Sequence, residues 1–347
     1  MSKQGAASNL MQKCLSFDDV LLVPKKSDIM SRSDIEIGTR IKRVNYSLPI
    51  ISSPMDTVTE DAMAISMALA GGLGIIHRYN SIEEQAEIVK KVRQKTNNIS
   101  IAVGASGDFL ERALVATGEG ANSICIDVAH GHHVLVERAI KTLKDNLNSD
   151  VAIIAGNVAT AEAFEDLQDW GADAIRVGIG GGSICSTRIQ TGHGVSTFQS
   201  ILACSFVKRK SLLIADGGIK TAGDIVKCIA AGADFAMLGS VLAGTDESPG
   251  ELIISNEGQN RKVYRGMASV EAQKDWRGQA RSLEGISTTV PYKGSVSKIL
   301  DSLSRNIRSG FSYSGARNQL DFRNKAMFIQ QSQSSRVESS THILTNV

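Results

Sequence analysis

The sequence predicts an α/β protein built as a single (β/α)₈ TIM barrel, and two observations lead to this fold class. Short and almost wholly apolar segments recur along the chain, and each is followed by glycine or polar residues and then by a segment with helical periodicity. Eight such units follow one another without a break in composition. Apolar strands separated by helices are typical of a covered parallel sheet, and eight units favour a closed barrel over an open sheet.

The expected elements alternate along most of the chain. The eight strands are expected over residues 49–53, 73–77, 100–104, 123–127, 151–156, 174–178, 212–216 and 235–239. The helices between them are expected over residues 60–70, 82–95, 110–117, 134–147, 161–170, 197–207 and 222–231, and a final helix over about 295–307. Polar and glycine residues gather just after the strands, which is the end of a barrel that carries the active site.

The whole chain, residues 1–347, is therefore predicted to be one catalytic domain. A polar segment of about residues 245–290 follows the last strand, and such an insertion is typical of a flap over the site. The serine-rich stretch of about residues 330–347 is expected to be a flexible C-terminal tail.

Composition argues against some classes of partner. The chain has 38 basic and 36 acidic residues, a formal net charge of +2 and 5% aromatic residues, which gives little support for nucleic-acid binding. No apolar run reaches the length of a membrane span, and the N-terminus lacks the pattern of a signal peptide. We therefore expect a cytoplasmic protein with no membrane partner.

The five cysteines are scattered and form no C-x-x-C pair, so neither a zinc site nor a redox couple is indicated. Cys204 and Cys228 lie on helical stretches and are expected to be buried thiols. Cys185 differs, because its loop, residues 178–188, is rich in glycine and hydroxyl groups. A loop cysteine can be activated as a thiolate, and Thr187 can hydrogen-bond a leaving group or water.

Two glycine loops, residues 213–219 and 237–240, follow the seventh and eighth strands, which is the usual phosphate position of a barrel. Asp216 in the first loop is suited to accept hydrogen bonds from ribose hydroxyls. The same loops hold flavin mononucleotide in other barrels, so an FMN-binding oxidoreductase is an alternative. A nucleotide-binding protein without activity is a third.

Seven segments, in this order, make the chain resemble the IMP dehydrogenase and GMP reductase family over nearly its whole length. They are LSFDDVLLVP at 15–24, SPMDTV at 53–58, GNVAT at 156–160, the cysteine loop, IADGGI at 214–219, YRGM at 264–267 and VPYKG at 290–294. The resemblance implies that Cys185 is the nucleophile that attacks purine C2. It implies that Thr187 and Glu284 manage protons there and that Arg78 is a basic residue near the deamination site.

The resemblance also implies the binding residues. Those for the purine nucleoside monophosphate are Ser183, Asp216, Gly218, Gly239, Ser240, Tyr264, Gly266 and Met267. Those for the nicotinamide cofactor are Asp127, Val128, Ala129 and Asn157. The backbone carbonyls of Gly180, Gly182 and Cys185 are candidate ligands of a monovalent cation such as K⁺, and residues 338–340 resemble a segment that helps to bind it between subunits of a homotetramer. The loop departs from the usual family pattern at Gly181, commonly proline, and at Ser186, commonly threonine.

Within the family the features favour the reductase branch. The second helix leads directly into the third strand, so there is no room for the regulatory CBS insert of many dehydrogenases. The flap is short, and its nearest match to the Arg-Tyr pair of dehydrogenases is Asp275-Trp-Arg277, in the wrong order. Residues 127–131 and Arg78 also resemble reductases, whereas residues 53–56 and 338–340 look more like dehydrogenases.

The resemblance therefore implies NADPH-dependent reductive deamination of GMP to IMP and ammonia through a covalent thioimidate on Cys185. The alternative is a compact IMP dehydrogenase without CBS domains, which would convert IMP and NAD to XMP.

Overall fold

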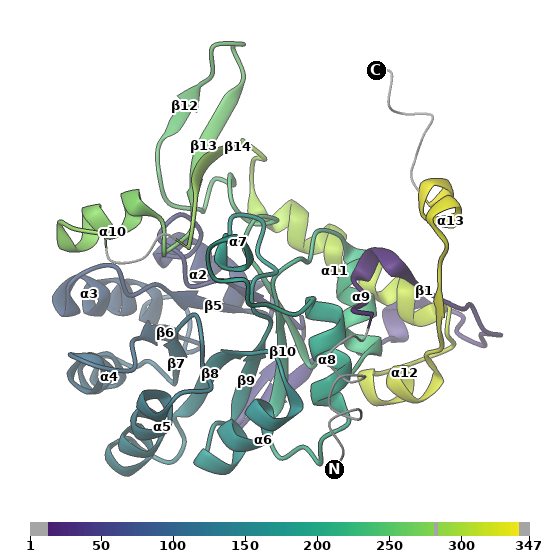
Figure 1. Ribbon diagram of the computed structural model, residues 1–347, viewed down its shortest axis with the longest axis horizontal. Coiled ribbons are helices and arrows are strands. Elements are labelled where there is room, and N and C mark those ends of the chain that lie inside the picture. The colour runs from purple at the N-terminus through teal and green to yellow at the C-terminus, as the bar shows by residue number, and fades with distance from the viewer. Residues whose placement is uncertain (1–12, 281–283, 340–347) are drawn as a thin grey trace.

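The centre of the molecule is a closed barrel of parallel strands wrapped by helices (Figure 1). The computed structural model describes residues 13–280 and 284–339. The barrel strands are β4 (Ile50–Ser52), β5 (Leu73–Ile76), β6 (Ser100–Val103), β7 (Ser123–Asp127), β8 (Ala152–Val158), β9 (Ala174–Val177), β10 (Leu212–Asp216) and β11 (Phe235–Leu238). They pair in chain order, and β11 pairs with β4 to close the ring. The predicted single-domain barrel is confirmed.

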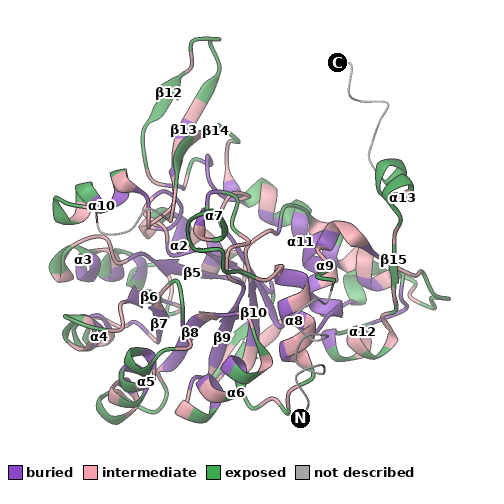
Figure 2. Ribbon diagram, in the orientation of Figure 1, coloured by how far each residue is buried: buried purple, intermediate pink, exposed green. Residues whose placement is uncertain are grey.

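Helices surround this barrel, and most of them bury the face that they turn toward it and expose the outer face, whereas the strands are buried (Figure 2). The α9 helix is buried on more than one face, because α11 and α12 pack against it. The helices that follow the strands are α2 (Asp61–Leu69), α3 (Ile82–Arg93), α4 (Phe109–Gly118), α5 (Val134–Asn146), α6 (Ala161–Trp170), α8 (Thr197–Ser205), α9 (Ala222–Ala230) and α11 (Val296–Ser312). A short helix, α7 (Thr187–Thr191), was not predicted and begins within the cysteine loop. Among the described residues no helix is long and apolar enough to cross a membrane.

Local sequence fixes where two of these helices begin. The Ser81 hydroxyl at the start of α3 accepts a hydrogen bond from the Glu84 amide at 3.0 Å, and the Glu84 carboxylate accepts one from the Ser81 amide at 2.8 Å. Thr221 and Asp224 make the same reciprocal pair at the start of α9. Such capping boxes satisfy amides that have no partner inside the helix. They therefore define the ends of the loops that follow β5 and β10.

The segment before the barrel closes the end of the barrel that lies away from the polar loops. It contains two 3₁₀ turns (Phe17–Asp19 and Arg32–Asp34), β1 (Val20–Leu22), β2 (Thr39–Ile41) and β3 (Val44–Tyr46), none of which was predicted. The β2–β3 hairpin places Ile41 and Tyr46 in the apolar cluster inside the barrel. The Tyr46 ring packs edge-on against Phe235 with centroids 5.4 Å apart. The barrel interior is thus a packed core that is closed at this end, and the polar loops lie at the opposite end.

The flap has more structure than a polar excursion suggests. Its three-stranded antiparallel sheet and one helix, α10 (Val270–Arg277), were not predicted, and part of the sheet projects beyond the barrel (Figure 1). The strands are β12 (Leu252–Ile254), β13 (Asn260–Arg265) and β14 (Ser287–Pro291). Residues 281–283 of the flap lie outside the described residues.

The chain after the flap continues beyond the helix that was expected to be last. The α11 helix extends to Ser312, further than the predicted 307, and α12 (Gln319–Lys325), β15 (Phe328–Gln330) and α13 (Gln333–Glu338) follow it. Strand β15 pairs antiparallel with β1, which joins the two ends of the described chain. The stretch predicted to be a flexible tail, 330–347, thus includes α13, and its residues 340–347 lie outside the described residues.

Asp234, just before β11, links the end of the barrel where the strands begin to the outer helices. Its side chain is 5% exposed, and its carboxylate accepts hydrogen bonds from the Leu213 amide at 2.7 Å, from Arg209 at 2.5 Å and from Arg323 of α12 at 2.8 Å. A buried carboxylate is tolerated only when its charge and lone pairs are matched in this way.

We predict that D234A lowers the free energy of unfolding by about 3–5 kcal/mol, because it leaves two guanidinium groups and an amide facing an apolar void. Urea denaturation followed by circular dichroism measures the change. The matched control is D145A, which removes an exposed carboxylate on α5 and should be nearly neutral. Equal stability of the two variants would contradict the prediction.

Candidate active site

A cavity of about 440 Å³ opens where the barrel strands end and the flap begins. The residues that the sequence predicts for catalysis, for the nucleotide, for the cofactor and for the loop carbonyls of a cation all line this cavity, although they come from distant parts of the chain. They are Arg78, Asp127, Val128, Ala129, Asn157, Gly180, Gly182, Ser183, Cys185, Thr187, Asp216, Gly218, Gly239, Ser240, Tyr264, Gly266, Met267 and Glu284. The structure thus brings the predicted set together, while the role of each residue is still a prediction.

The cysteine loop packs so closely on its neighbours that one of its positions requires glycine and a second leaves little room for a side chain. A Cβ atom at Gly178 would lie 1.9 Å from the Asp216 carbonyl oxygen, and the backbone there has a φ of +145°. A Cβ at Gly181 would lie 2.5 Å from the Thr197 hydroxyl oxygen. A side chain at this position would therefore require the Thr197 hydroxyl to shift.

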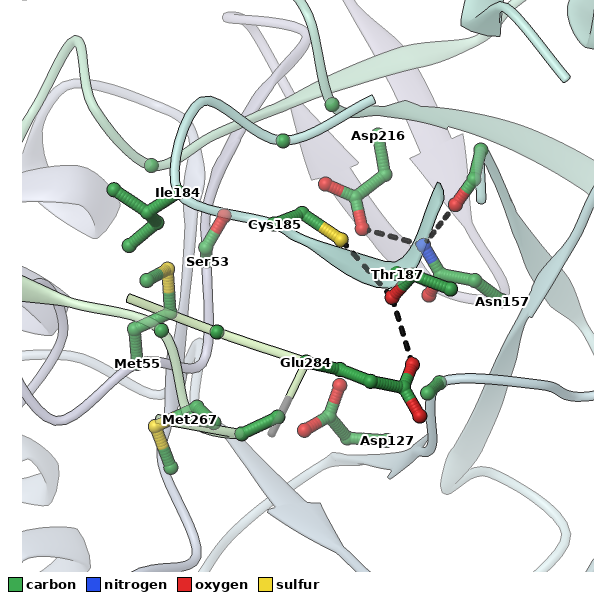
Figure 3. A pocket seen from close by; sticks show the side chains of 18 of the residues that line it. Ser53, Met55, Asp127, Asn157, Ile184, Cys185, Thr187, Asp216, Met267 and Glu284 are labelled. Atoms are coloured by element: carbon green, nitrogen blue, oxygen red, sulfur yellow. Dashed lines mark hydrogen bonds between the residues drawn. The ribbon is translucent and has the colours of Figure 1, made fainter. Parts of the chain in front are cut away.

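Three side chains form a hydrogen-bonded chain at the centre of the cavity (Figure 3). The Cys185 thiol donates to the Thr187 hydroxyl at 3.2 Å, and the Thr187 hydroxyl donates to the Glu284 carboxylate at 2.8 Å. Both donations run in the same direction, from sulfur toward the carboxylate. The arrangement can therefore move a proton between Cys185 and Glu284, as nucleophilic catalysis requires.

Backbone hydrogen bonds hold the flap against the cysteine loop. The Ser186 amide donates to the Glu284 carbonyl at 3.0 Å, and the Ile286 amide donates to the Ile184 carbonyl at 3.1 Å. Cys185 and Gly285 form an antiparallel bridge between these two contacts. The position of the Glu284 carboxylate is thus fixed relative to the cysteine by main chain on both sides.

A buried guanidinium that the sequence analysis missed organises the barrel side of the site. Arg176 of β9 donates to the Asp127 carboxylate and, at 2.8 Å, to the Asp216 carboxylate, which also accepts from Asn157 at 2.7 Å. Burial alone would lower the pKa of Arg176, but Asp216 and Asp127 outweigh it and raise that pKa well above its ordinary value. The signal in the sequence was a single charged residue within the apolar run 174–177.

Hydroxyl groups and glycine gather on the opposite side, after β11. The Tyr264 side chain of β13 is buried, and a Cβ at Gly239 would lie 3.0 Å from its hydroxyl oxygen. Burial raises the pKa of Tyr264, and its hydrogen bonds to Ser183 and Ser240 oppose that rise only in part. The phenol therefore stays protonated near neutral pH and can donate to an anion, as the predicted phosphate site requires.

The flap helix α10 covers the cavity near Asp127 through an aromatic and cationic cluster that was not predicted. The Trp276 ring stacks on Tyr79 with centroids 4.2 Å apart, and the guanidinium carbon of Arg277 lies 4.1 Å from the centroid of the same indole ring. The Arg78 guanidinium carbon lies 5.6 Å from that centroid, and its Nη2 donates to the Asp127 carbonyl at 3.2 Å. In the sequence, residues 275–277 stand out only as an imperfect match to an Arg-Tyr pair, so the stacking role of Trp276 was missed.

Three of the five cysteines are buried and are poor nucleophiles, whereas Cys185 is exposed and lines the cavity. Burial raises the pKa of Cys125 and of Cys204 to about 12, and it raises the pKa of Cys228 well above its usual value. Cys204 and Cys228 are buried, as expected. Cys14 is exposed but does not line the cavity, and its sulfur lies 3.2 Å from the Ser196 hydroxyl oxygen.

Several buried polar atoms beside Asp127 have no hydrogen-bond partner among the residues that the structure describes. They are Arg78 Nε, Asn157 Oδ1 and Arg176 Nε, all on residues that line the cavity. Buried polar groups are normally paired, so a polar ligand such as the ribose and amide of a nicotinamide cofactor fits this side of the cavity. The donors of Arg78 and Arg176 and the amide oxygen of Asn157 supply both hydrogen-bonding roles.

The candidate ligands of a monovalent cation are backbone carbonyl oxygens rather than side chains. Gly180, Gly182 and Cys185 lie in one loop, and backbone carbonyls are suitable ligands for a monovalent cation. The Gly182 carbonyl also accepts a hydrogen bond from the Cys185 amide at 3.1 Å. Glu338 and Ser339 lie at the end of α13 and do not line the cavity, and Ser340 lies outside the described residues. Within the described residues no group of three or more His, Cys, Asp or Glu side chains could hold a metal ion.

We predict that iodoacetamide modifies only Cys14 and Cys185 of the five cysteines in the native protein, because the other three are buried and their thiols stay protonated. Peptide mass spectrometry measures the sites, and C14S provides the control in which Cys185 alone reacts. Modification of Cys125, Cys204 or Cys228 in the folded protein, at a rate comparable to that of Cys14 and Cys185, would contradict the burial of these three thiols.

Comparison with known proteins gives a consistent result. Residues 14–342 match the model of the IMP dehydrogenase / GMP reductase domain. The inosine-5′-monophosphate dehydrogenase of Cryptosporidium parvum is 37% identical, over 95% of both chains, and the GMP reductase of Leishmania major is 32% identical, over 96% of this chain and 97% of its own. A variant of the GMP reductase from Trypanosoma brucei, solved in complex with guanosine 5′-monophosphate, superimposes with a TM-score of 0.91 at 30% identity and covers 97% of this chain and 99% of its own. The chain therefore belongs to the IMP dehydrogenase / GMP reductase family.

Proposed function

We propose that this member of the family is a GMP reductase, which uses NADPH to convert GMP to IMP and ammonia. The observation that carries the proposal is the flap: it holds Glu284 against Thr187 and Cys185, and its helix α10 covers the Asp127 side of the cavity by stacking Trp276 on Tyr79. The family consists of oxidoreductases that use nicotinamide cofactors.

Both reactions of the family proceed through the same cysteine adduct, so the cysteine cannot distinguish them. The residues of the flap, which act on the adduct, can. A dehydrogenase hydrolyses the adduct after the cofactor leaves and needs a flap residue pair that activates water, which in the resemblance is Arg-Tyr. Residues 269–284 contain no arginine followed by tyrosine. The flap offers an acid, Glu284, that is already connected to the nucleophile. Such an acid suits the loss of an amine.

The proton path suggests how these residues act. The Cys185 proton passes through Thr187 to Glu284, and the thiolate adds to C2 of GMP. Glu284 returns a proton through Thr187 to the exocyclic amine, so that the C2–N bond breaks and ammonia leaves. NADPH supplies the hydride at C2. The C2–S bond then breaks, the sulfur recovers its electron pair as a thiolate, and IMP is released.

The binding assignments follow from where the groups lie. Tyr264, Ser183, Ser240 and the glycine amides are the proposed phosphate ligands, and Asp216, fixed by Arg176, is the proposed ribose ligand. Arg78, Asp127, Val128, Ala129 and Asn157 are the residues proposed to hold the cofactor. From the family resemblance we also propose a monovalent cation on the cysteine loop, a homotetramer and a cytoplasmic location.

A compact IMP dehydrogenase is the second candidate. It is favoured by the 37% identity to the dehydrogenase of Cryptosporidium parvum, which exceeds the 32% identity to the reductase of Leishmania major. A dehydrogenase would use the same cysteine and the same phosphate ligands, so only turnover can separate the two activities.

Paired absorbance assays on the pure protein test the proposal. We expect NADPH to be consumed when GMP is present, and no NADH to form from IMP and NAD with potassium. Formation of NADH from IMP and NAD, with no consumption of NADPH when GMP is present, would establish the dehydrogenase instead. The control is C185A, which should lose all turnover and still bind GMP in a calorimeter, because the thiol is needed for the covalent step only.

We predict that E284Q lowers kcat by about 10²–10⁴-fold, because glutamine preserves the shape but cannot exchange a proton with Thr187. KM for GMP should change little, since the carboxylate acts after binding. The control is E271Q, which changes an exposed carboxylate in the first turn of the same flap helix. A kcat of E284Q within twofold of the unsubstituted protein would remove Glu284 from the mechanism.

A further inference from the structure

A buried lysine in the flap has backbone carbonyls as its hydrogen-bond partners. Lys262 of β13 is 7% exposed, and its ammonium donates to the carbonyl oxygens of Thr245 at 2.9 Å, Asp246 at 3.4 Å and Ser248 at 2.7 Å. Thr245 and Ser248 are themselves buried. The cage therefore isolates a positive charge from water and surrounds it with the negative ends of peptide dipoles.

The acidic side chains nearest to this ammonium are engaged elsewhere. The Asp246 carboxylate accepts a hydrogen bond from the Tyr292 hydroxyl at 2.6 Å. The Glu247 carboxylate accepts from the Ser295 hydroxyl at 2.9 Å and from the Val296 amide at 2.7 Å, at the start of α11. Burial lowers the pKa of Lys262, and these two carboxylates oppose that effect. Carbonyl cages of this kind are the usual environment of a bound monovalent cation, and here the cation is tethered to a strand.

The cage joins two parts of the candidate phosphate site. Lys262 lies two residues before Tyr264 on the same strand, so their side chains leave β13 on the same face. The carbonyls belong to the segment that follows β11 and the loop with Gly239 and Ser240. The Tyr264 hydroxyl in turn lies against this loop, since a Cβ atom at Gly239 would lie 3.0 Å from its oxygen. The ammonium and the phenol thus connect the same strand to the same loop at two points.

We propose that Lys262 is a positioning residue, an internal cation that fixes β13 against the segment after β11 and so holds Tyr264 at the distance from Ser240 that the nucleotide phosphate requires. The inference rests on the proposed nucleotide site. It adds a residue that does not touch the ligand and nevertheless sets the affinity for it.

The first test compares K262M with the unsubstituted protein in a calorimetric titration with GMP. Methionine fills the space but cannot donate, so three carbonyls lose their partner, and we expect affinity for GMP to fall on the order of tenfold. The rate at which iodoacetamide modifies Cys185 without nucleotide should stay the same, because the cysteine loop is not held by this cage. The matched control is K274M, which removes an exposed ammonium from the same flap.

The second test restores the cation from solution. K262A leaves a space lined by carbonyls that a primary alkylammonium can enter. Adding n-propylammonium should recover GMP affinity in a saturable way, whereas tetramethylammonium, which has no N–H donor, should not. This arm also applies if K262M does not fold, since K262A can be refolded with n-propylammonium present.

The outcomes separate this inference from the proposed function. If the unsubstituted protein binds neither GMP nor IMP, the proposed function fails. If it binds GMP and folded K262M binds it equally well, or if K262A shows the same weak binding at every n-propylammonium concentration, Lys262 does not position the site. Loss of Cys185 reactivity together with loss of binding would indicate a general structural role and would also overturn the inference.

Discussion

The barrel end of the site depends on one buried charge. Arg176 lies among apolar neighbours and hydrogen-bonds both Asp127 and Asp216. One guanidinium group thus fixes the positions of both carboxylates relative to each other. Breaking such a buried network leaves uncompensated charge, which makes the arrangement rigid. The two carboxylates face different proposed ligands, a cofactor and a ribose. Their separation is therefore set before either ligand arrives.

The flap completes the site without a central buried charge. It is held mainly by backbone hydrogen bonds to the cysteine loop, by the stack of Trp276 on Tyr79 and by Arg265, which forms ion pairs with Asp56 and Asp275. Among these contacts, the Trp276 stack and the ion pair to Asp275 are partly exposed to solvent, so they can be broken at lower cost than the buried network of Arg176. A fixed barrel end and an exchangeable flap suit an enzyme that must admit two ligands and then exclude water.

The sequence predicted the barrel because each strand is apolar and each helix is periodic, and these local signals agree with the global fold. It predicted the site residues because their motifs are specific to a family. It could not predict the β12–β13–β14 sheet, whose strands mix exposed apolar and charged residues, nor the β2–β3 hairpin, whose burial depends on the barrel that it closes. Arg176 and Trp276 were missed because their roles arise from partners far apart in the chain.

The Tyr79–Trp276 stack also gives the protein an internal optical reporter. The chain has two tryptophans, and Trp170 lies on α6, away from the cavity, whereas Trp276 packs against two guanidinium groups and a phenol ring on the flap helix α10. The emission of an indole depends on such neighbours. A ligand that displaces α10 would therefore change the emission wavelength and intensity of Trp276, while Trp170 would contribute a constant background.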